Sequence, residues 1–175
     1  DLPEYHRRSI RIKDYDYSQS GGYFVTIVTW KREWLFGRID AGNMQMNSLG
    51  RIALYEWLRT SRLRPFVTLF EDEFVVMPNH VHGILWIHGD EAGMPGKGAA
   101  TLRPYGKMAM PAVVPESVGA IVRAYKSAVT YAINRERGIR GTPVWQRNYY
   151  EHIPRDERDY QKVYDYIAGN PLKWE

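Results

Sequence analysis

The sequence contains no cysteine, and this absence limits the chemistry that the chain can support. Disulfide bonds and thiolate ligands are excluded, so a bound metal ion would need histidine, carboxylate, amide or water ligands. The chain also lacks any apolar run close to the ~20 residues of a membrane-spanning helix, and no signal-peptide pattern opens it. We therefore expect a cytoplasmic protein without a membrane span.

A strong excess of charge of one sign is missing too, since the net charge of the 175 residues is only +4. The cations are nevertheless grouped: Arg7, Arg8, Arg11 and Lys13 lie near the start, and Arg123, Lys126, Arg135, Arg137 and Arg140 lie in the last third. Together with 13 Tyr and 6 Trp, this mixture of cations and rings suits nucleic acid, although many basic faces are simply solvated. We expect the first group to clamp DNA, and Arg123 and Lys126, three apart on one helix face, to line its backbone.

Turn residues and apolar periodicity divide the chain, which is long enough for one domain over 1–175, into strands and helices. We expect, in order, a basic arm at 1–20, a strand at 23–30, a helix from Asn47 or Ser48 to Pro65, a strand at 66–77, a strand beginning at His80, a flexible insertion at 89–115, a helix at 116–137, a short strand or edge segment at 144–153, and a helix at 157–169. The first helix should bury Ile52, Leu54, Tyr55 and Leu58. This order predicts an α+β fold of ferredoxin-like type, with an antiparallel four-stranded sheet, helices on one face and a further C-terminal helix.

His80 and His82 stand at the head of an apolar strand, directly after Pro78-Asn79. Side chains two apart on a strand point to the same face, so the two imidazoles can aim at one point. Neutral imidazole is a common ligand of divalent metals, and the Pro-Asn turn places the pair where loops and substrates meet. A purely structural pair is the alternative, and His88 at the other end of the strand reads as an ordinary strand-end residue.

The last helix carries three tyrosines, and the helical period separates them. Tyr160 and Tyr164 share an apolar stripe with Val163 and Ile167, which predicts core positions for both. Tyr166 lies at the edge of that stripe among polar residues, so it is the candidate for chemistry. Its hydroxyl could attack phosphorus and form a covalent intermediate.

Asn170 follows Tyr166 by one helical turn and points the same way. Its amide oxygen could complete a metal site with the two histidines, leaving positions open for a phosphate. These four residues form the predicted site, with Tyr166 as nucleophile and His80, His82 and Asn170 around the metal.

Three motifs in this order resemble one known family. They are HVH at 80–82 after MPN at 77–79, VWQRNYYEH at 144–152, and YDYIAGNP at 164–171. The chain resembles the REP-associated tyrosine transposases, which are HUH-type single-strand nucleases related to the single-tyrosine transposases of insertion sequences. The resemblance runs from about Arg8 to Trp174.

The resemblance implies a specific reaction and a role for each matching residue. His80 and His82 match the metal-binding pair, Tyr166 matches the nucleophile, and Asn170 matches a polar residue associated with the metal. Such enzymes cut single-stranded DNA beside a palindromic hairpin with Mg²⁺ or Mn²⁺, leaving a 5′-phosphotyrosine and a free 3′-hydroxyl. No catalytic role is implied for Tyr149, Tyr150 or His152, and Trp145 and Tyr149 are expected to fill core rather than stack on bases.

Other classes fit the sequence less well. Histidine-triad hydrolases need a third histidine where Ile84 stands, and amidohydrolase barrels need ~250 residues. A ferredoxin-like module that binds single-stranded nucleic acid without cutting it is the main alternative. The glycine-aromatic spacing that is usual in such modules is missing from 23–30. A catalytically inactive relative that only binds DNA is a second form of this alternative. Both a monomer and a homodimer are compatible with the sequence.

Overall fold

The computed structural model describes residues 20–88 and 117–174. The expected basic arm, with Arg7, Arg8, Arg11 and Lys13, and the expected insertion at 89–115 lie outside these ranges. The elements are β1 (Gly21–Val28), β2 (Gly37–Asp40), β3 (Asn43–Met46), α1 (Ser48–Leu63), β4 (Val67–Thr68), β5 (Phe74–Met77), β6 (His80–Ile87), α2 (Val118–Glu136), β7 (Tyr150–His152) and α3 (Glu157–Gly169). Short 3-10 helices lie at Trp30–Arg32, Glu71–Glu73 and Pro171–Lys173.

The main sheet is antiparallel and confirms the predicted fold class. Its strand order is β4-β6-β1-β7, and β5 also pairs with β6. Because β4 pairs with one end of β6 and β5 with the other, the five strands fill four positions. The prediction of one unbroken strand at 66–77 was wrong: the 3-10 helix Glu71–Glu73 interrupts it, since Glu73 is buried and bonds across to Trp86 and Tyr160.

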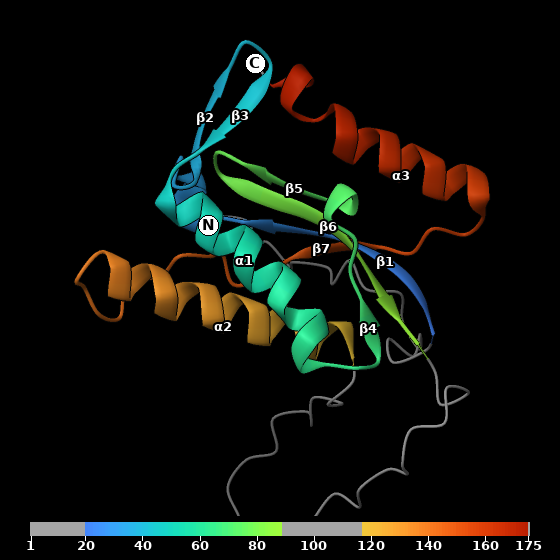
Figure 1. Cartoon of the computed structure of the whole chain (residues 1–175), viewed down its shortest axis with the longest axis horizontal. Coiled ribbons are helices and arrows are strands. Elements are labelled where there is room, and N and C mark those ends of the chain that lie inside the picture. Colours follow the sequence, from blue (N-terminus) through green and yellow to red (C-terminus); the bar gives the residue numbers. More distant parts are fainter. Residues whose placement is uncertain (1–19, 89–116, 175) are drawn as a thin grey trace, which may run out of the picture.

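Strand alternation gives the sheet two different apolar faces. On one face, Tyr23, Val25 and Ile27 of β1 pack with the buried residues of α1 and α2 in the larger core. On the other face, a smaller core joins Phe24 and Ile84 of the sheet to Val163 and Ile167 of α3. The helices α1 and α2 thus cover one face and α3 crosses the other (Figure 1).

Helix α1 begins as predicted, and Ile52, Leu54 and Leu58 pack on the larger core as expected, although they are only partly buried. The side chain of Asn47 caps it by accepting from the Gly50 amide at 2.9 Å. Ala53 and Trp57 are fully buried, whereas Tyr55, which we expected inside, is 59% exposed. The larger ring of Trp57 takes the core position, where it stacks on Phe74 with ring centroids 4.6 Å apart.

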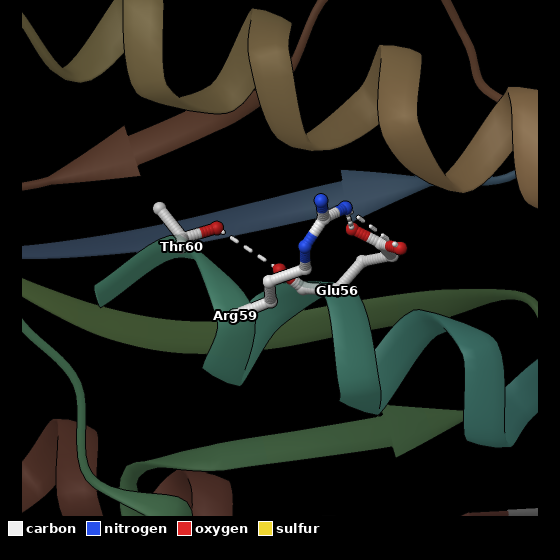
Figure 2. A network of polar contacts seen from close by, with 3 residues as sticks. All are labelled: Glu56, Arg59 and Thr60. Carbon is white, nitrogen blue, oxygen red and sulfur yellow. Dashed lines mark hydrogen bonds and ion pairs between the residues drawn. The ribbon is translucent and has the colours of Figure 1, made fainter. Parts of the chain in front are cut away.

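A small polar network joins neighbouring turns of α1 (Figure 2). Arg59 pairs with the Glu56 carboxylate at 3.2 Å, and the Thr60 hydroxyl donates to the Glu56 carbonyl at 3.0 Å. These contacts connect neighbouring turns of one helix and involve no residue of the opposite sheet face, where α3 packs.

The hairpin formed by β2 and β3 was not predicted. A two-residue turn, Ala41-Gly42, joins the strands, and both residues have positive φ, at 47° and 74°. Such a turn matches the twist of a hairpin, but alanine there does not mark it in the sequence. Among the described residues, no helix is long and apolar enough to cross a membrane.

Candidate active site

The two histidines of β6 lie side by side on the α3 face of the sheet. His80 is opposite Val28 of β1 and His82 is opposite Thr26, which confirms that both side chains point to one face. Their rings meet edge to face with centroids 4.5 Å apart. The turn before them is held by Thr29, whose amide and hydroxyl both donate to the Asn79 carbonyl at 2.9 Å.

Both imidazoles are oriented through Nδ1. His80 Nδ1 lies 2.7 Å from the side-chain oxygen of Asn79, whose Nδ2 donates to the Arg32 carbonyl at 3.4 Å. That oxygen can only accept, so His80 carries its proton on Nδ1 and its lone pair on Nε2. His82 Nδ1 lies 2.7 Å from the Thr26 hydroxyl, which can accept from it; in that tautomer the lone pair of His82 is on Nε2.

Burial keeps this pair neutral. Desolvation, followed by the nearby Arg32 charge, lowers the pKa of His80 to about 4. Desolvation, followed by His80, lowers the pKa of His82 to about 3. At neutral pH both rings therefore have a free lone pair, the form that binds a metal ion.

Tyr166 comes to this pair from α3. Its ring meets His82 edge to face at a centroid distance of 5.0 Å and Phe24 at 6.2 Å, while the residue stays 44% exposed. The structure thus brings Tyr166 of the last helix to a histidine pair near the middle of the sequence. The ring rests on the site and its outer side is open to a substrate.

The other two tyrosines of α3 are engaged elsewhere. Tyr160 donates its hydroxyl to Glu73 at 2.5 Å, and Tyr164 donates to Asp72 at 3.1 Å. Each hydrogen bond to a carboxylate raises the pKa of its tyrosine. Tyr160 packs on the smaller core as predicted, but Tyr164 belongs to neither core, so its predicted core position was wrong. Between described residues, no hydrogen bond involves the Tyr166 hydroxyl.

Asn170 directly follows α3 and is buried, with 8% of its surface exposed. Its Nδ2 atom has no hydrogen-bond partner among the described residues. The chain then turns through Pro171–Lys173 and brings the Trp174 ring to 5.8 Å from His80. The end of α3 is thereby drawn toward the histidines, and a ligand role for Asn170 stays a prediction.

The donor set fits a divalent ion that keeps open positions. The Nε2 atom of His82 is buried and has no hydrogen-bond partner in the described part of the chain. No group of three or more His, Asp or Glu side chains in 20–88 and 117–174 could hold a metal. An ion here would therefore take two imidazoles, with amide, water or phosphate oxygen completing the shell.

The predicted DNA contacts on α2 lie apart from this site. Helix α2 covers the opposite face of the sheet, where Arg123 is exposed. Lys126 donates to the carbonyls of Gln146 and Arg147 at 2.6 and 3.0 Å, and burial lowers its pKa. It therefore holds the loop before β7, and DNA binding by Arg123 and Lys126 stays a prediction. Trp145 is buried, as expected of a core residue.

Two clefts open on the α3 side of the sheet. The larger, about 570 Å³, lies at the start of α3 and includes Asp72, Glu73, Asp156 and Glu157. The smaller, about 240 Å³, adjoins Tyr166 and also contains Tyr150 and Lys162. Neither of these last two was assigned a role from the sequence, because only the folded chain brings β7 beside α3.

The sequence and the fold were compared with those of known proteins. No family model matches the sequence. A Haemophilus influenzae protein described as uncharacterized is 42% identical over 174 residues, covering 98% of this chain and 91% of its own. A REP-associated tyrosine transposase, solved bound to a REP hairpin, superposes with a TM-score of 0.57 and 22% identity over 93% of this chain and 73% of its own. A provisionally assigned transposase from Deinococcus radiodurans R1 gives a TM-score of 0.48 and 15% identity, over 90% and 94% of the two chains.

Proposed function

Because this chain belongs to one family with the Haemophilus influenzae protein and has the fold of a REP-associated tyrosine transposase, we propose that it is a metal-dependent single-strand DNA endonuclease and strand transferase. The observation that carries the proposal is the contact of Tyr166 with His82, in a pair of neutral histidines held through Nδ1. Its substrate would be single-stranded DNA beside a palindromic hairpin, by analogy with the hairpin-bound transposase.

Tyr166 is the nucleophile in this proposal. Its hydroxyl oxygen attacks the scissile phosphorus, the bond from phosphorus to the 3′-oxygen breaks, and the phenolic proton is transferred overall to that oxygen. The products are a 5′-phosphotyrosine and a free 3′-hydroxyl. Attack of a 3′-hydroxyl on the phosphotyrosine reverses the step and joins strands, so the bond energy is retained for transfer.

The remaining predicted residues hold the cofactor. His80, His82 and Asn170 would hold Mg²⁺ or Mn²⁺, which when bound supplies positive charge to polarise the scissile phosphate. Thr26 and Asn79 bind the Nδ1 atoms and so orient the two imidazoles with Nε2 directed to the ion, as outer partners of metal-binding histidines commonly do. Trp174 and Phe24 flank the rings and limit the access of water.

The test is covalent capture of labelled DNA. A hairpin-bearing single strand labelled at its 3′ end is incubated with the protein and Mg²⁺ or Mn²⁺, and a denaturing gel is read for a protein-linked label. The wild type should form the adduct and Tyr166→Phe should not. Tyr164→Phe is the matched control, because Tyr164 is on the same helix and its hydroxyl is bound to Asp72.

Two further outcomes decide between enzyme and binding module. His80→Ala should lose cleavage while retaining DNA binding, because His80 is proposed to bind the metal ion and not the DNA. If the wild type binds the hairpin but yields no adduct with either metal, the non-catalytic binding module replaces the enzyme. An adduct that persists in Tyr166→Phe would refute the assignment of the nucleophile.

A further inference from the structure

The smaller cleft adjoins the proposed nucleophile and is formed by β1, β7 and α3. Its volume is about 240 Å³, and its lining residues are Phe24, Tyr150, His152, Lys162, Val163 and Tyr166. Pockets for drug-sized ligands occupy roughly 300–1,000 Å³, so this space suits one nucleobase rather than a base pair. Because Tyr166 is one of its walls, an occupant would lie next to the reacting phosphate.

Two aromatic rings besides Tyr166 give the cleft its apolar surface. Tyr150 of β7 is 43% exposed, although its neighbours in sequence, Tyr149 and Glu151, are more buried. Phe24 of β1 is buried and stacks on His82 with ring centroids 5.5 Å apart. An exposed tyrosine beside a fixed phenyl ring is the kind of surface on which an unpaired base stacks.

Lys162 supplies a cation on the same side of α3 as Tyr166, since the two are one helical turn apart. The carboxylates nearest to it along the helix are occupied: Asp159 bonds to His152 at 3.0 Å, and Asp165 accepts from Gln161 at 2.8 Å. Within the described residues, Lys162 forms no ion pair. Its ammonium is therefore available for a phosphate.

The walls of the cleft are fixed to each other. The contact between His152 and Asp159 joins β7 to α3, and the same Asp159 oxygen accepts from the Arg155 amide at 3.1 Å. Val163 packs on Phe24 in the smaller core. The cleft is thus held open by contacts that do not use Tyr150 or Lys162.

We infer that this cleft binds the nucleotide next to the scissile phosphate. The base stacks on the exposed ring of Tyr150 and touches the buried Phe24 side chain where it lines the cleft, and Lys162 contacts a phosphate of the same nucleotide. The inference rests on the proposed function for the chemistry at Tyr166, but the binding that it describes can be measured without cleavage. Every base has a π-face and can stack in this way. We therefore expect the cleft to position the strand with little preference for one base over another.

The first experiment detects the stacked base. The Tyr166→Phe protein, which cannot cleave, is titrated with hairpin-bearing single strands that carry one 2-aminopurine at successive positions. One position should show strong fluorescence quenching, and adding Tyr150→Ala should remove it and weaken binding about tenfold. Tyr150→Phe should retain it, because stacking needs the ring alone. The matched control is Tyr131→Ala, an exposed tyrosine of α2 on the opposite face of the sheet.

The second experiment tests the cation. Lys162→Met should lower the slope of log Kd against log salt concentration by about 0.7, as for one lost contact to a single-strand phosphate. Arg158→Met on the same helix removes the same charge outside both clefts and should leave the slope unchanged. An equal change in both variants would mean a long-range charge effect and would overturn the assignment of Lys162.

The two proposals can fail separately. If the wild type forms the covalent adduct while Tyr150→Ala and Lys162→Met change neither quenching nor affinity, the nucleotide cleft is refuted and the nuclease stands. If no adduct forms but quenching and salt slope respond as expected, the cleft stands as a DNA-binding site and the nuclease is refuted.

Discussion

His82 and Tyr166 meet edge to face, with ring centroids 5.0 Å apart and an angle of 68° between the ring planes. One residue belongs to the central strand β6 and the other to α3. The contact depends on the smaller core, because Val163 and Ile167 dock α3 on Phe24 and Ile84. The position of the proposed nucleophile is therefore set by apolar packing, whereas the orientation of the histidines is set by hydrogen bonds.

Thr26→Val should weaken metal binding without unfolding the protein. Valine has nearly the shape of threonine but cannot form a hydrogen bond with His82 Nδ1, so the ring loses the contact that orients it. Loss of such an outer partner typically costs about 10–100-fold in metal affinity. Calorimetric titration with Mn²⁺ measures the change in metal affinity. Thr26→Ser keeps the hydroxyl and should bind the metal as the wild type does. Unchanged affinity in Thr26→Val would mean that this hydrogen bond does not orient the ring.

Stability should fall in mild acid because of the histidine pair. In the folded chain the pKa values of His80 and His82 are lowered to about 4 and about 3, whereas an unfolded histidine titrates near ~6.5. Below that pH the unfolded state binds more protons, so the stabilisation is complete above ~6.5 and is lost as the pH falls toward the folded pKa values. Without added metal, urea unfolding should show a loss of several kcal/mol between pH 7 and pH 4.

The control for this effect is the double variant His80→Asn with His82→Asn, which has no imidazole to protonate at the site. Its free energy of unfolding should depend less steeply on pH over the same range. An equally steep dependence in the double variant would assign the acid sensitivity to other groups.

Local signals were sufficient to predict much of the fold. The three long helices lie where apolar periodicity placed them, and Asn47, Ser117 and Asp156 cap them through side-chain oxygens. The hairpin of β5 and β6 follows from Pro78-Asn79. The position of Glu73 could not be predicted from local signals. Its carboxylate is buried because it accepts hydrogen bonds from Trp86 and Tyr160, which are distant in the sequence.

The candidate site also has one part that the sequence predicts and another that only the folded structure explains. The common direction of His80 and His82 follows from the two-residue period of a strand, and the separation of Tyr166 from Tyr160 follows from the helical period. The half-buried position of Tyr164 outside both cores depends on its contact with Asp72, and the cleft at Tyr150 depends on how β7 and α3 meet. Neither contact leaves a pattern within one segment of the sequence.

Glu73→Ala should destabilise the protein by about 2–4 kcal/mol, because two hydrogen-bond donors lose their charged acceptor. The buried carboxylate accepts from Trp86 Nε1 at 2.7 Å and from the Tyr160 hydroxyl at 2.5 Å. Tyr160→Phe removes only one of these bonds and should cost less. Tyr164→Phe, at the neighbouring exposed contact with Asp72, should be nearly neutral. Urea unfolding of the three variants gives the order, and a neutral Glu73→Ala would refute the structural role of this network.

Gly83→Ala should destabilise the larger core, whereas Gly169→Ala should not. An added Cβ at Gly83 would lie 2.6 Å from Trp57 Cζ2 and 2.7 Å from Phe74 Cδ2. These rings are stacked on each other and buried, so neither can move without repacking, and overpacking of this kind costs about 1–3 kcal/mol or more.

At Gly169, the last residue of α3, the nearest atom to an added Cβ is Lys173 Cε at 3.8 Å. Alanine favours the helix over glycine by up to ~1 kcal/mol, so this variant should be neutral or slightly stabilised. Thermal unfolding compares the two substitutions, which add the same methyl group. Equal melting temperatures would show that β6 can move away from Trp57, and that the close approach of α1 to the strand carrying the histidines does not require glycine.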